Sequence, residues 1–186
     1  MRCGVEVTPV RATPDDEAEQ VTQALLGEPL RVEERRAGWV RVVTAYEYPG
    51  WVREETLADG AGELPPPVDG EPLDVAREYL GTPYLWGGLT DQGIDCSGLV
   101  HMAYRRLGRI VPRDADQQED AGTEVGELRP GDLIMYGEPG EAADHVAFWL
   151  GEGRILHSTG RENGIGVLEE LEPASLRARR RRLIRL

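Results

Sequence analysis

The first 57 residues of the chain alternate short apolar runs with residues that favour turns. The first run ends at Arg11, and the later ones cover residues 21–26, 30–34, 39–44 and 51–52. Because side chains alternate along a strand, Val40 and Val42 would share one face of the 39–44 run and Trp39 would lie on the other. Short strands separated by turn residues at this spacing predict a small β-barrel of about 55 residues.

Residues 58–70 read ADGAGELPPPVDG and show no apolar periodicity. Three consecutive prolines favour an extended and fairly stiff segment. We therefore expect residues 1–57 to form one domain, residues 58–70 to be a linker, and residues 71–186 to form a second domain.

The second domain is expected to begin with a helix. Pro72 suits a position in the first turn, and Gly81 suits the residue just beyond a helix end. Leu73, Ala76 and Leu80 recur at helical spacing and would form the buried face.

A second helix is expected from about residue 96 to residue 107. Asp95 is a candidate N-cap and Gly108 a candidate stop, and apolar residues recur between them at helical spacing. Cys96 would therefore lie at or beside the N-terminus of this helix.

Three strands are expected after a polar stretch, over residues 132–136, 145–150 and 154–158. The last two are joined by a Gly-Glu-Gly turn. Near the C-terminus, four consecutive arginines run into Leu183 and Ile184, a pattern typical of a closing strand with a solvated flank. The alternative is a basic tail that binds phosphates. Helices combined with antiparallel strands place the chain in the α+β class.

Charge and composition exclude several classes of function. The chain has 186 residues and a formal net charge of −13, and all 21 of its cationic residues are arginines. A mechanism that needs a Schiff-base or P-loop lysine is therefore impossible. The acidic bulk would repel nucleic acid. No apolar run approaches the roughly 20 residues that a membrane-spanning helix needs, so we expect no membrane partner.

The two cysteines, Cys3 and Cys96, are too few for a disulfide framework or a cysteine-rich metal cluster. There is no HExxH or CxxC pattern, so we expect neither a metal nor another cofactor. The N-terminal residues lack the apolar stretch of a secretory signal. If Met1 is the native start, a reduced, cytoplasmic location is expected. Oligomeric state and the role of Cys3 stay open.

Cys96 is the candidate nucleophile. Only the thiolate is a good nucleophile, and a helix N-terminus together with a neighbouring imidazolium would favour it. A buried cysteine is often inert, but Cys96 is flanked by Asp95, Ser97 and two glycines in a polar segment. His101 lies five residues along the same helix and about 140° away around its axis, so it is a poor candidate for the base.

His145 and His157 are the remaining histidines. For a turn centred near Glu152, antiparallel pairing places His145 opposite residues 158–160, which brings the two histidines to one end of the hairpin. Either alone is explained as an ordinary strand residue. Packed beside Cys96, they would supply a base and a polar group that orients it.

Two resemblances to known families follow from these segments. The first domain resembles bacterial SH3-type domains, through residues 23–28 (QALLGE), 38–42 (GWVRV) and 50–57 (GWVREETL). The second resembles the NlpC-type papain-like cysteine peptidases of bacterial cell-wall metabolism. Five blocks carry this resemblance in order: GTPYLWGG, GIDCSGLV, PRDADQQ, LRPGDLIMY and DHVAFWLGEGRILHS. It implies a papain-like domain with helices packed on an antiparallel sheet.

The resemblance also implies roles for residues. Cys96 would be the nucleophile, His145 the general base and acid, and His157 the orienting residue. A backbone N–H at the start of the Cys96 helix would stabilise the oxyanion, with Tyr84 nearby. In members with a preceding SH3-type domain, Asp95 and Ser97 would bind the L-Ala and D-Glu part of the substrate, although Asp95 is equally a helix cap. Tyr48, or else Tyr46, would lie near the substrate amine.

The implied activity is hydrolysis, through a thioester, of the γ-D-glutamyl to diamino-acid bond in peptidoglycan stem peptides with a free N-terminal L-Ala. This is the chemistry of muropeptide recycling. The third stem residue, whether diaminopimelate, lysine or ornithine, is not specified by the sequence. Two alternatives stay open. The same thioester would permit acyl transfer to an acceptor other than water, and a catalytically silent relative would bind wall peptide without cleaving it.

Overall fold

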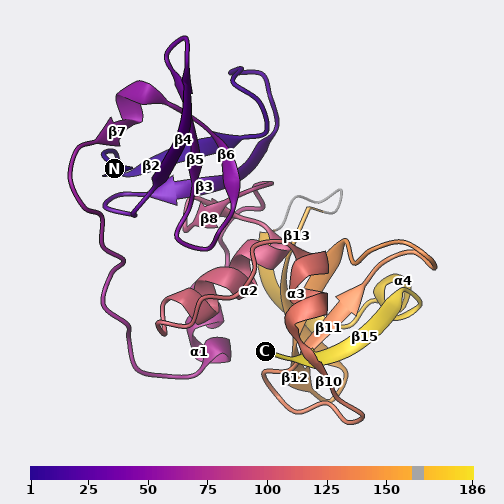
Figure 1. The fold of residues 1–186 in the computed structure, drawn as a ribbon. Helices are drawn as coiled ribbons and strands as arrows, with labels where there is room; N and C mark the ends of the chain where they lie inside the picture. Colours follow the sequence, from indigo (N-terminus) through magenta and orange to yellow (C-terminus); the bar gives the residue numbers. More distant parts are fainter. Residues whose placement is uncertain (161–165) are drawn as a thin grey trace. The chain divides into compact units, whose positions relative to one another are not determined.

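The computed structural model of the chain describes residues 1–160 and 166–186, and these divide into two compact units. The first unit comprises Met1–Pro66 and the second Pro67–Leu186. The division falls inside the proline-rich segment 58–70. Figure 1 shows the first unit in indigo to magenta and the second in magenta to yellow.

The first unit is built from strands, as its alternating pattern predicts. Its strands are β1 (Arg2–Cys3), β2 (Val7–Arg11), β3 (Gln20–Leu25), β4 (Arg31–Arg36), β5 (Trp39–Val43), β6 (Pro49–Arg53) and β7 (Leu57–Ala58), with a 3₁₀ turn, η1 (Glu54–Thr56), before the last. Five of them form an antiparallel sheet in the order β3-β2-β6-β5-β4, and β1 pairs with β7. The expected strand-rich N-terminal domain is confirmed.

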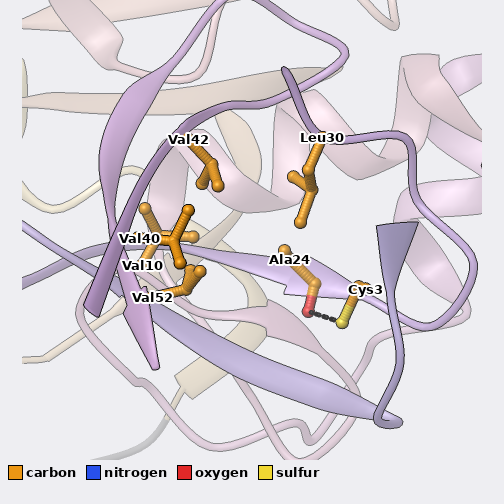
Figure 2. Close-up of a cluster of buried hydrophobic side chains, with 7 residues drawn as sticks. All are labelled: Cys3, Val10, Ala24, Leu30, Val40, Val42 and Val52. Carbon is orange, nitrogen blue, oxygen red and sulfur yellow. Dashed lines mark hydrogen bonds between the residues drawn. The ribbon is translucent and has the colours of Figure 1, made fainter. Parts of the chain in front are cut away.

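The core of the first unit is a cluster of small and branched apolar side chains, drawn in Figure 2. Val40 and Val42 both point into it, which confirms the face assigned to them from alternation. Cys3 is a member of the same cluster, and its sulfur lies 3.2 Å from the carbonyl oxygen of Val5 and 3.5 Å from that of Ala24, either of which can accept the S–H proton. Burial raises the pKa of Cys3, so this cysteine serves as a small core residue.

The segment between the domains is attached at both ends. Glu63 N–H donates to the carbonyl of Gly27 in the first unit, and Val68 N–H donates to the carbonyl of Arg106 in the second. A Cβ on Gly62 would lie 2.5 Å from the backbone nitrogen of Pro29, so only glycine allows this close approach. The free connecting segment is therefore shorter than the thirteen residues expected from composition.

The second unit contains a six-stranded antiparallel sheet in the order β10-β15-β11-β12-β13-β14. Its strands are β10 (Thr123–Glu124), β11 (Leu133–Tyr136), β12 (His145–Gly151), β13 (Arg154–Thr159), β14 (Gly166–Leu171) and β15 (Arg180–Arg185). The three strands expected over 132–136, 145–150 and 154–158 are confirmed. Three of the four consecutive arginines, Arg180, Arg181 and Arg182, lie in β15, beside β11, which confirms the closing strand.

Four helices accompany this sheet within the described residues: α1 (Pro72–Arg77), α2 (Cys96–Arg105), α3 (Ala115–Ala121) and α4 (Ala174–Arg177). A two-stranded ribbon, β8 (Leu89–Thr90) with β9 (Gly93–Ile94), precedes α2. α2 packs against β12 and β13, and α1 packs against α2. None of the helices described is long and apolar enough to span a membrane.

The first helix is shorter than its sequence pattern predicts. α1 ends at Arg77, and the following residues form tighter turns up to Gly81, whose φ is +85°. Val75, Ala76 and Tyr79 are buried, whereas Leu80 is 48% exposed. The assignment of Leu80 to the buried face is therefore wrong, because the chain leaves helical geometry before residue 80 and rotates that side chain outward.

Candidate active site

The N-terminus of α2 is fixed by Asp95, as expected for an N-cap. Its Oδ1 atom accepts a hydrogen bond from the N–H of Gly98 at 2.6 Å. A Cβ at Gly98 would lie 2.4 Å from the carbonyl oxygen of Gly88, so this turn needs a glycine after Ser97. The sequence GIDCSG thus places Cys96 in the first turn of a buried helix.

Cys96 is 6% exposed, and its sulfur has hydrogen-bond partners in the backbone of Val146 and Ser97. Val146 directly follows His145 in β12, so this contact brings the start of α2 against the start of the histidine strand. Burial, with a smaller contribution from the Asp95 carboxylate, raises the pKa of Cys96 to about 12. The resting side chain is therefore a thiol, and a base must take its proton during reaction.

The two strand histidines are in direct contact. His145 Nε2 lies 2.8 Å from His157 Nδ1, and their rings meet edge to face with centroids 5.0 Å apart. The register of β12 with β13 pairs Phe148 with Leu156, which extrapolates to His145 opposite residue 159, within the expected range. The prediction that the hairpin brings these histidines together is confirmed.

A carboxylate extends the hydrogen-bonded pair of histidines. His157 Nε2 lies 2.9 Å from Glu170 Oε1, on β14, and His157 is fully buried. A carboxylate only accepts hydrogen bonds, so the proton of a neutral His157 lies on Nε2 and its Nδ1 accepts from His145 Nε2–H. The lone pair of His145 is then on Nδ1, and this nitrogen would act as the general base.

The Asp95 carboxylate also accepts hydrogen bonds from groups outside α2. Arg113, only 1% exposed, donates from Nη2 to Asp95 Oδ2 at 2.7 Å and from Nη1 to Oδ1 at 3.0 Å. The N–H of Gly87 donates to Oδ2 at 2.7 Å. Arg113 Nη1 also donates to Ser97 Oγ at 3.0 Å. Asp95 is therefore a confirmed cap and part of a buried ion pair, and its contact with a substrate ammonium stays a prediction.

Tyr84 lies near the nucleophile. It forms an isolated bridge with Ile94, two residues before Cys96. Burial raises the pKa of the Tyr84 hydroxyl, and the charges of a Cys96 thiolate and of Asp95 raise it further, so the phenol stays protonated and can donate. A Cβ on Gly160 would lie 2.9 Å from the Tyr84 ring, so this glycine makes room for it.

Tyr46 and Tyr48, the two tyrosines considered for a contact with the substrate amine, belong to the first unit. Tyr46 is buried, and its hydroxyl donates to the carbonyl of Gln23 at 3.0 Å and contacts Thr22 Oγ1 at 2.9 Å. Tyr48 is half-buried and its ring centroid lies 6.3 Å from that of Tyr46. Tyr46 is thus a structural residue of the barrel, and a substrate contact by Tyr48 stays a prediction.

His101 is fully buried, and its Nδ1 lies 2.8 Å from the carbonyl oxygen of Val111. Burial lowers its pKa to about 3, with a further contribution from Arg105. His101 therefore stays neutral on a buried face of α2. This agrees with the expectation that His101 is a poor candidate for the general base. Within the described parts of the chain, no group of three or more histidine, cysteine or acidic residues is arranged to hold a metal ion.

The model of the NlpC/P60 family matches residues 81–178, more than half of the chain, and that of the bacterial dipeptidyl-peptidase Sh3 domain matches residues 10–57. The chain belongs to the NlpC/P60 family. Both resemblances inferred from motifs are confirmed. The NlpC/P60 match contains Cys96, His145 and His157, and also Glu170.

Relatives of this NlpC/P60 protein include two named gamma-D-glutamyl-L-lysine dipeptidyl-peptidase. The relative from Bacillus cereus is 31% identical, and the match covers 69% of this chain and 40% of the relative. The relative from Bacillus subtilis is 39% identical, and the match covers 52% of this chain and 34% of the relative. The chain thus spans less than half the length of these relatives.

Solved structures agree on the fold. An NlpC/P60 family protein from Bacillus cereus aligns with 99% of this chain and 62% of its own, with a TM-score of 0.58 at 22% identity. The peptidoglycan hydrolase RipB from Mycobacterium tuberculosis aligns with 61% of this chain and 62% of its own, with a TM-score of 0.53 at 32% identity.

Three residues of this NlpC/P60 site are not identified by the sequence analysis: Arg113, Gln118 and Glu170. Gln118 is fully buried and its Nε2 donates to the carbonyl of Ser97 at 3.0 Å, below the first turn of α2. The block PRDADQQ, one of the five that carry the family resemblance, contains Arg113 and Gln118, and their presence in this block was the available signal. Glu170 has no such signal, because β14 itself was not predicted.

Proposed function

We propose that this protein is a cysteine peptidase that hydrolyses the γ-D-glutamyl to diamino-acid bond of peptidoglycan stem peptides. The observation that carries the proposal is the hydrogen-bonded pair of His145 and His157, together with the contact between the Cys96 sulfur and the backbone of Val146, the residue after His145. The relatives' names support the bond, since they specify a γ-D-glutamyl group joined to a diamino acid.

In the proposed reaction, His145 Nδ1 takes the proton of the Cys96 thiol as the sulfur attacks the carbonyl carbon of the γ-D-glutamyl group. The imidazolium then gives this proton to the leaving amine, the C–N bond breaks, and a thioester remains. His145 next deprotonates a water molecule, which attacks the thioester and releases the acyl product and the free thiol. Coupling proton transfer to attack is required because the buried thiol is protonated at rest.

The first turn of α2 would stabilise the oxyanion. Backbone N–H groups at a helix N-terminus have no intrahelical partners and carry partial positive charge. The Tyr84 hydroxyl, protonated and close to Cys96, would be a second donor.

We further propose that the protein acts on free muropeptides in the cytoplasm, with Asp95, Ser97 and Tyr48 contributing to recognition of the L-Ala and D-Glu portion. The first unit supports this, because it matches the Sh3 domain model described for bacterial dipeptidyl-peptidases. A site that pairs a substrate ammonium with fixed polar groups rejects an acylated amine strongly, because those groups would then be buried unpaired.

Hydrolysis of the peptide L-Ala-γ-D-Glu-diamino acid, measured by mass spectrometry, tests the activity. We expect Cys96→Ala to lower kcat/KM by at least ~10³-fold, and Cys3→Ala to retain turnover because Cys3 lies in the barrel core. Retained turnover by Cys96→Ala would refute the mechanism. If the unaltered protein binds the peptide but produces neither hydrolysis nor amine adducts, the protein is the silent binding module.

Acetylation of the substrate amine tests the recycling part separately. We expect the blocked peptide to be cleaved at least ~10²-fold more slowly than the free one. Equal rates would refute the requirement for free L-Ala while leaving the peptidase activity intact.

A further inference from the structure

A row of polar side chains crosses five neighbouring strands of the sheet in the second unit. It consists of Arg180 on β15, Tyr136 on β11, His145 on β12, His157 on β13 and Glu170 on β14. The strand register pairs Arg180 with Tyr136, and Tyr136 with His145. Hydrogen bonds join His145 to His157, and His157 to Glu170. His145 therefore has a neighbour on each side, and the proposed reaction gives no role to Tyr136.

Tyr136 contacts the imidazole of His145 through its ring. The two residues lie directly opposite each other across β11 and β12, and their ring centroids are 5.6 Å apart with 39° between the planes. Aromatic rings at this distance attract each other, and a phenol ring also attracts a cation. Tyr136 is fully buried, so its ring keeps water from this side of His145. The imidazole thus has a ring contact from each neighbouring strand, since His157 meets it from β13.

The hydroxyl of Tyr136 fixes the position of its ring. Tyr136 Oη donates to Glu172 Oε1 at 3.1 Å, and burial together with the charge of Glu172 raises the pKa of this hydroxyl, which stays protonated. The buried Glu172 carboxylate also accepts from Arg180 Nε and Nη2, both at 2.6 Å, and from Arg177 Nε at 2.9 Å. Charge-assisted and bidentate contacts hold this carboxylate in one place, and the phenol that donates to it is held with it.

The orientation of His145 matters because this imidazole must take a proton from the thiol and give it to the leaving amine. Both transfers need a nitrogen within hydrogen-bond reach and in line with the reacting group. The hydrogen bond to His157 fixes one atom of the imidazole, Nε2, and leaves the plane of the ring free to tilt. A second contact on the ring itself, from Tyr136, restricts that tilt.

We propose that Tyr136 is a positioning residue for His145: its ring fixes the plane of the imidazole, and its hydrogen bond to Glu172 keeps that ring in place. The inference rests on the proposed function, in which His145 is the general base and acid. Tyr136 acts only through His145 and makes no contact with the substrate in this role. Its removal should therefore lower kcat and leave KM nearly unchanged.

Two substitutions separate the ring from the hydroxyl. Tyr136→Leu removes the ring, and kcat for the peptide L-Ala-γ-D-Glu-diamino acid should fall about tenfold, with KM changed by no more than about twofold. Tyr136→Phe keeps the ring but loses the hydrogen bond that holds it, so kcat should fall only about threefold. Arg177 and Arg180 still neutralise Glu172 in both variants, so neither leaves an uncompensated buried charge.

Tyr104→Leu is the matched control. Tyr104 is also buried, but it lies on α2, where its ring contacts the Arg109 guanidinium. The variant makes the same change in another core tyrosine and should leave kcat unchanged, and thermal unfolding will show that each variant is folded. An equal fall in kcat for Tyr104→Leu would assign the effect to a general loss of packing and overturn the inference. Equal falls for Tyr136→Leu and Tyr136→Phe would overturn it too, because the ring would then contribute nothing.

NMR of the imidazole nitrogens gives a readout that is independent of turnover. The chain has only three histidines, so their signals can be told apart. We expect His145 to show one neutral tautomer, with its proton on Nε2, in the unaltered protein and a mixture of tautomers in Tyr136→Leu. If Tyr136→Leu does not fold, Tyr136→Phe decides, through its kcat and its His145 signals.

Unchanged kcat and unchanged His145 signals in the folded variant would overturn the inference while leaving the peptidase activity standing. Failure of the unaltered protein to cleave the peptide would refute the proposed function. The His145 signals would then still decide whether Tyr136 orients the imidazole.

Discussion

His157 Nε2 lies 2.9 Å from Glu170 Oε1, and this contact places a carboxylate behind the two histidines of the candidate site. His157 pairs with Leu168 across β13 and β14, so Glu170 reaches it diagonally from two residues further along the neighbouring strand. The carboxylate fixes the tautomer of His157, and through it that of His145.

Replacement of Glu170 should therefore change the pH profile as well as the rate. We expect Glu170→Leu to lower kcat by about tenfold with little change in KM, because it leaves His157 free to adopt the wrong tautomer. The acid limb of the kcat/KM profile should move to lower pH, since a carboxylate favours the protonated imidazole pair. Glu170→Gln, which keeps an acceptor but no charge, should rescue part of kcat.

The control for this experiment is Glu169→Gln. Glu169 is the next residue in β14, and its carboxylate contacts Arg77 and Arg154. Its replacement should leave the pH profile in place. An unchanged profile in Glu170→Leu would show that the carboxylate has no influence on the histidines.

The protonation state of Cys96 gives a second prediction. Because its pKa is raised to about 12, the thiolate fraction should increase about tenfold for each pH unit between 7 and 9. Alkylation of Cys96 by iodoacetamide, measured in a Cys3→Ala background, should increase by the same factor. A rate that is constant from pH 6 to 9 would instead indicate a preformed thiolate and contradict the coupled proton transfer.

The buried pair of Arg113 and Asp95 gives a third prediction. Arg113→Met would leave the Asp95 carboxylate buried without its cation, which costs about 3–5 kcal/mol in the free energy of unfolding. Urea denaturation will measure this loss. The double variant Asp95→Asn/Arg113→Met should recover part of it, because the uncompensated charge is gone. Arg106→Met, at an exposed ion pair, should cost no more than about 1 kcal/mol.

Glu172 gives a prediction about acid stability. Burial acts to raise the pKa of its carboxyl, but hydrogen bonds from Arg180 and Arg177 outweigh this and hold the pKa below its usual value. A carboxyl with a lowered folded-state pKa stabilises the fold above the unfolded-state pKa of about 4.3, and this stabilisation is lost as the pH falls through the folded-state value.

Urea unfolding of Glu172→Gln, measured from pH 7 to pH 3, tests whether Glu172 stabilises the fold at neutral pH and loses this effect in acid. The free energy of unfolding of the variant should be lower at pH 7 and should fall less steeply below pH 4.5 than that of the unaltered protein. The exposed Glu127→Gln serves as the control and should reproduce the unaltered slope. Parallel curves for Glu172→Gln and the unaltered protein would contradict the assignment.

Local patterns predicted much of this protein. Strands β11, β12, β13 and β15, the position of Cys96 at the start of α2, and the Asp95 cap follow from alternation, helical spacing and capping residues. These features depend on neighbours within a few residues, and the sequence displays such neighbours directly. The motif blocks likewise sufficed for the family.

The sequence did not determine the ending of α1 or the contacts beneath the nucleophile. Leu80 turns outward because α1 ends at Arg77 and the residues after it form tighter turns, and Arg113 reaches Asp95 across eighteen residues. Such contacts depend on packing between distant segments, and a local pattern carries no record of them.

The chemistry of the site was predicted in part by the sequence and decided in part by the tertiary structure. Residue type and hairpin register brought His145 and His157 together in the sequence analysis, but the atoms that meet were fixed only by the packed sheet. Glu170 was supplied by the tertiary structure alone. Burial is the main cause of the raised pKa of Cys96, whereas the position of this residue at a helix N-terminus predicted a lowered pKa. Desolvation depends on what packs over a group, and that is decided by the whole fold.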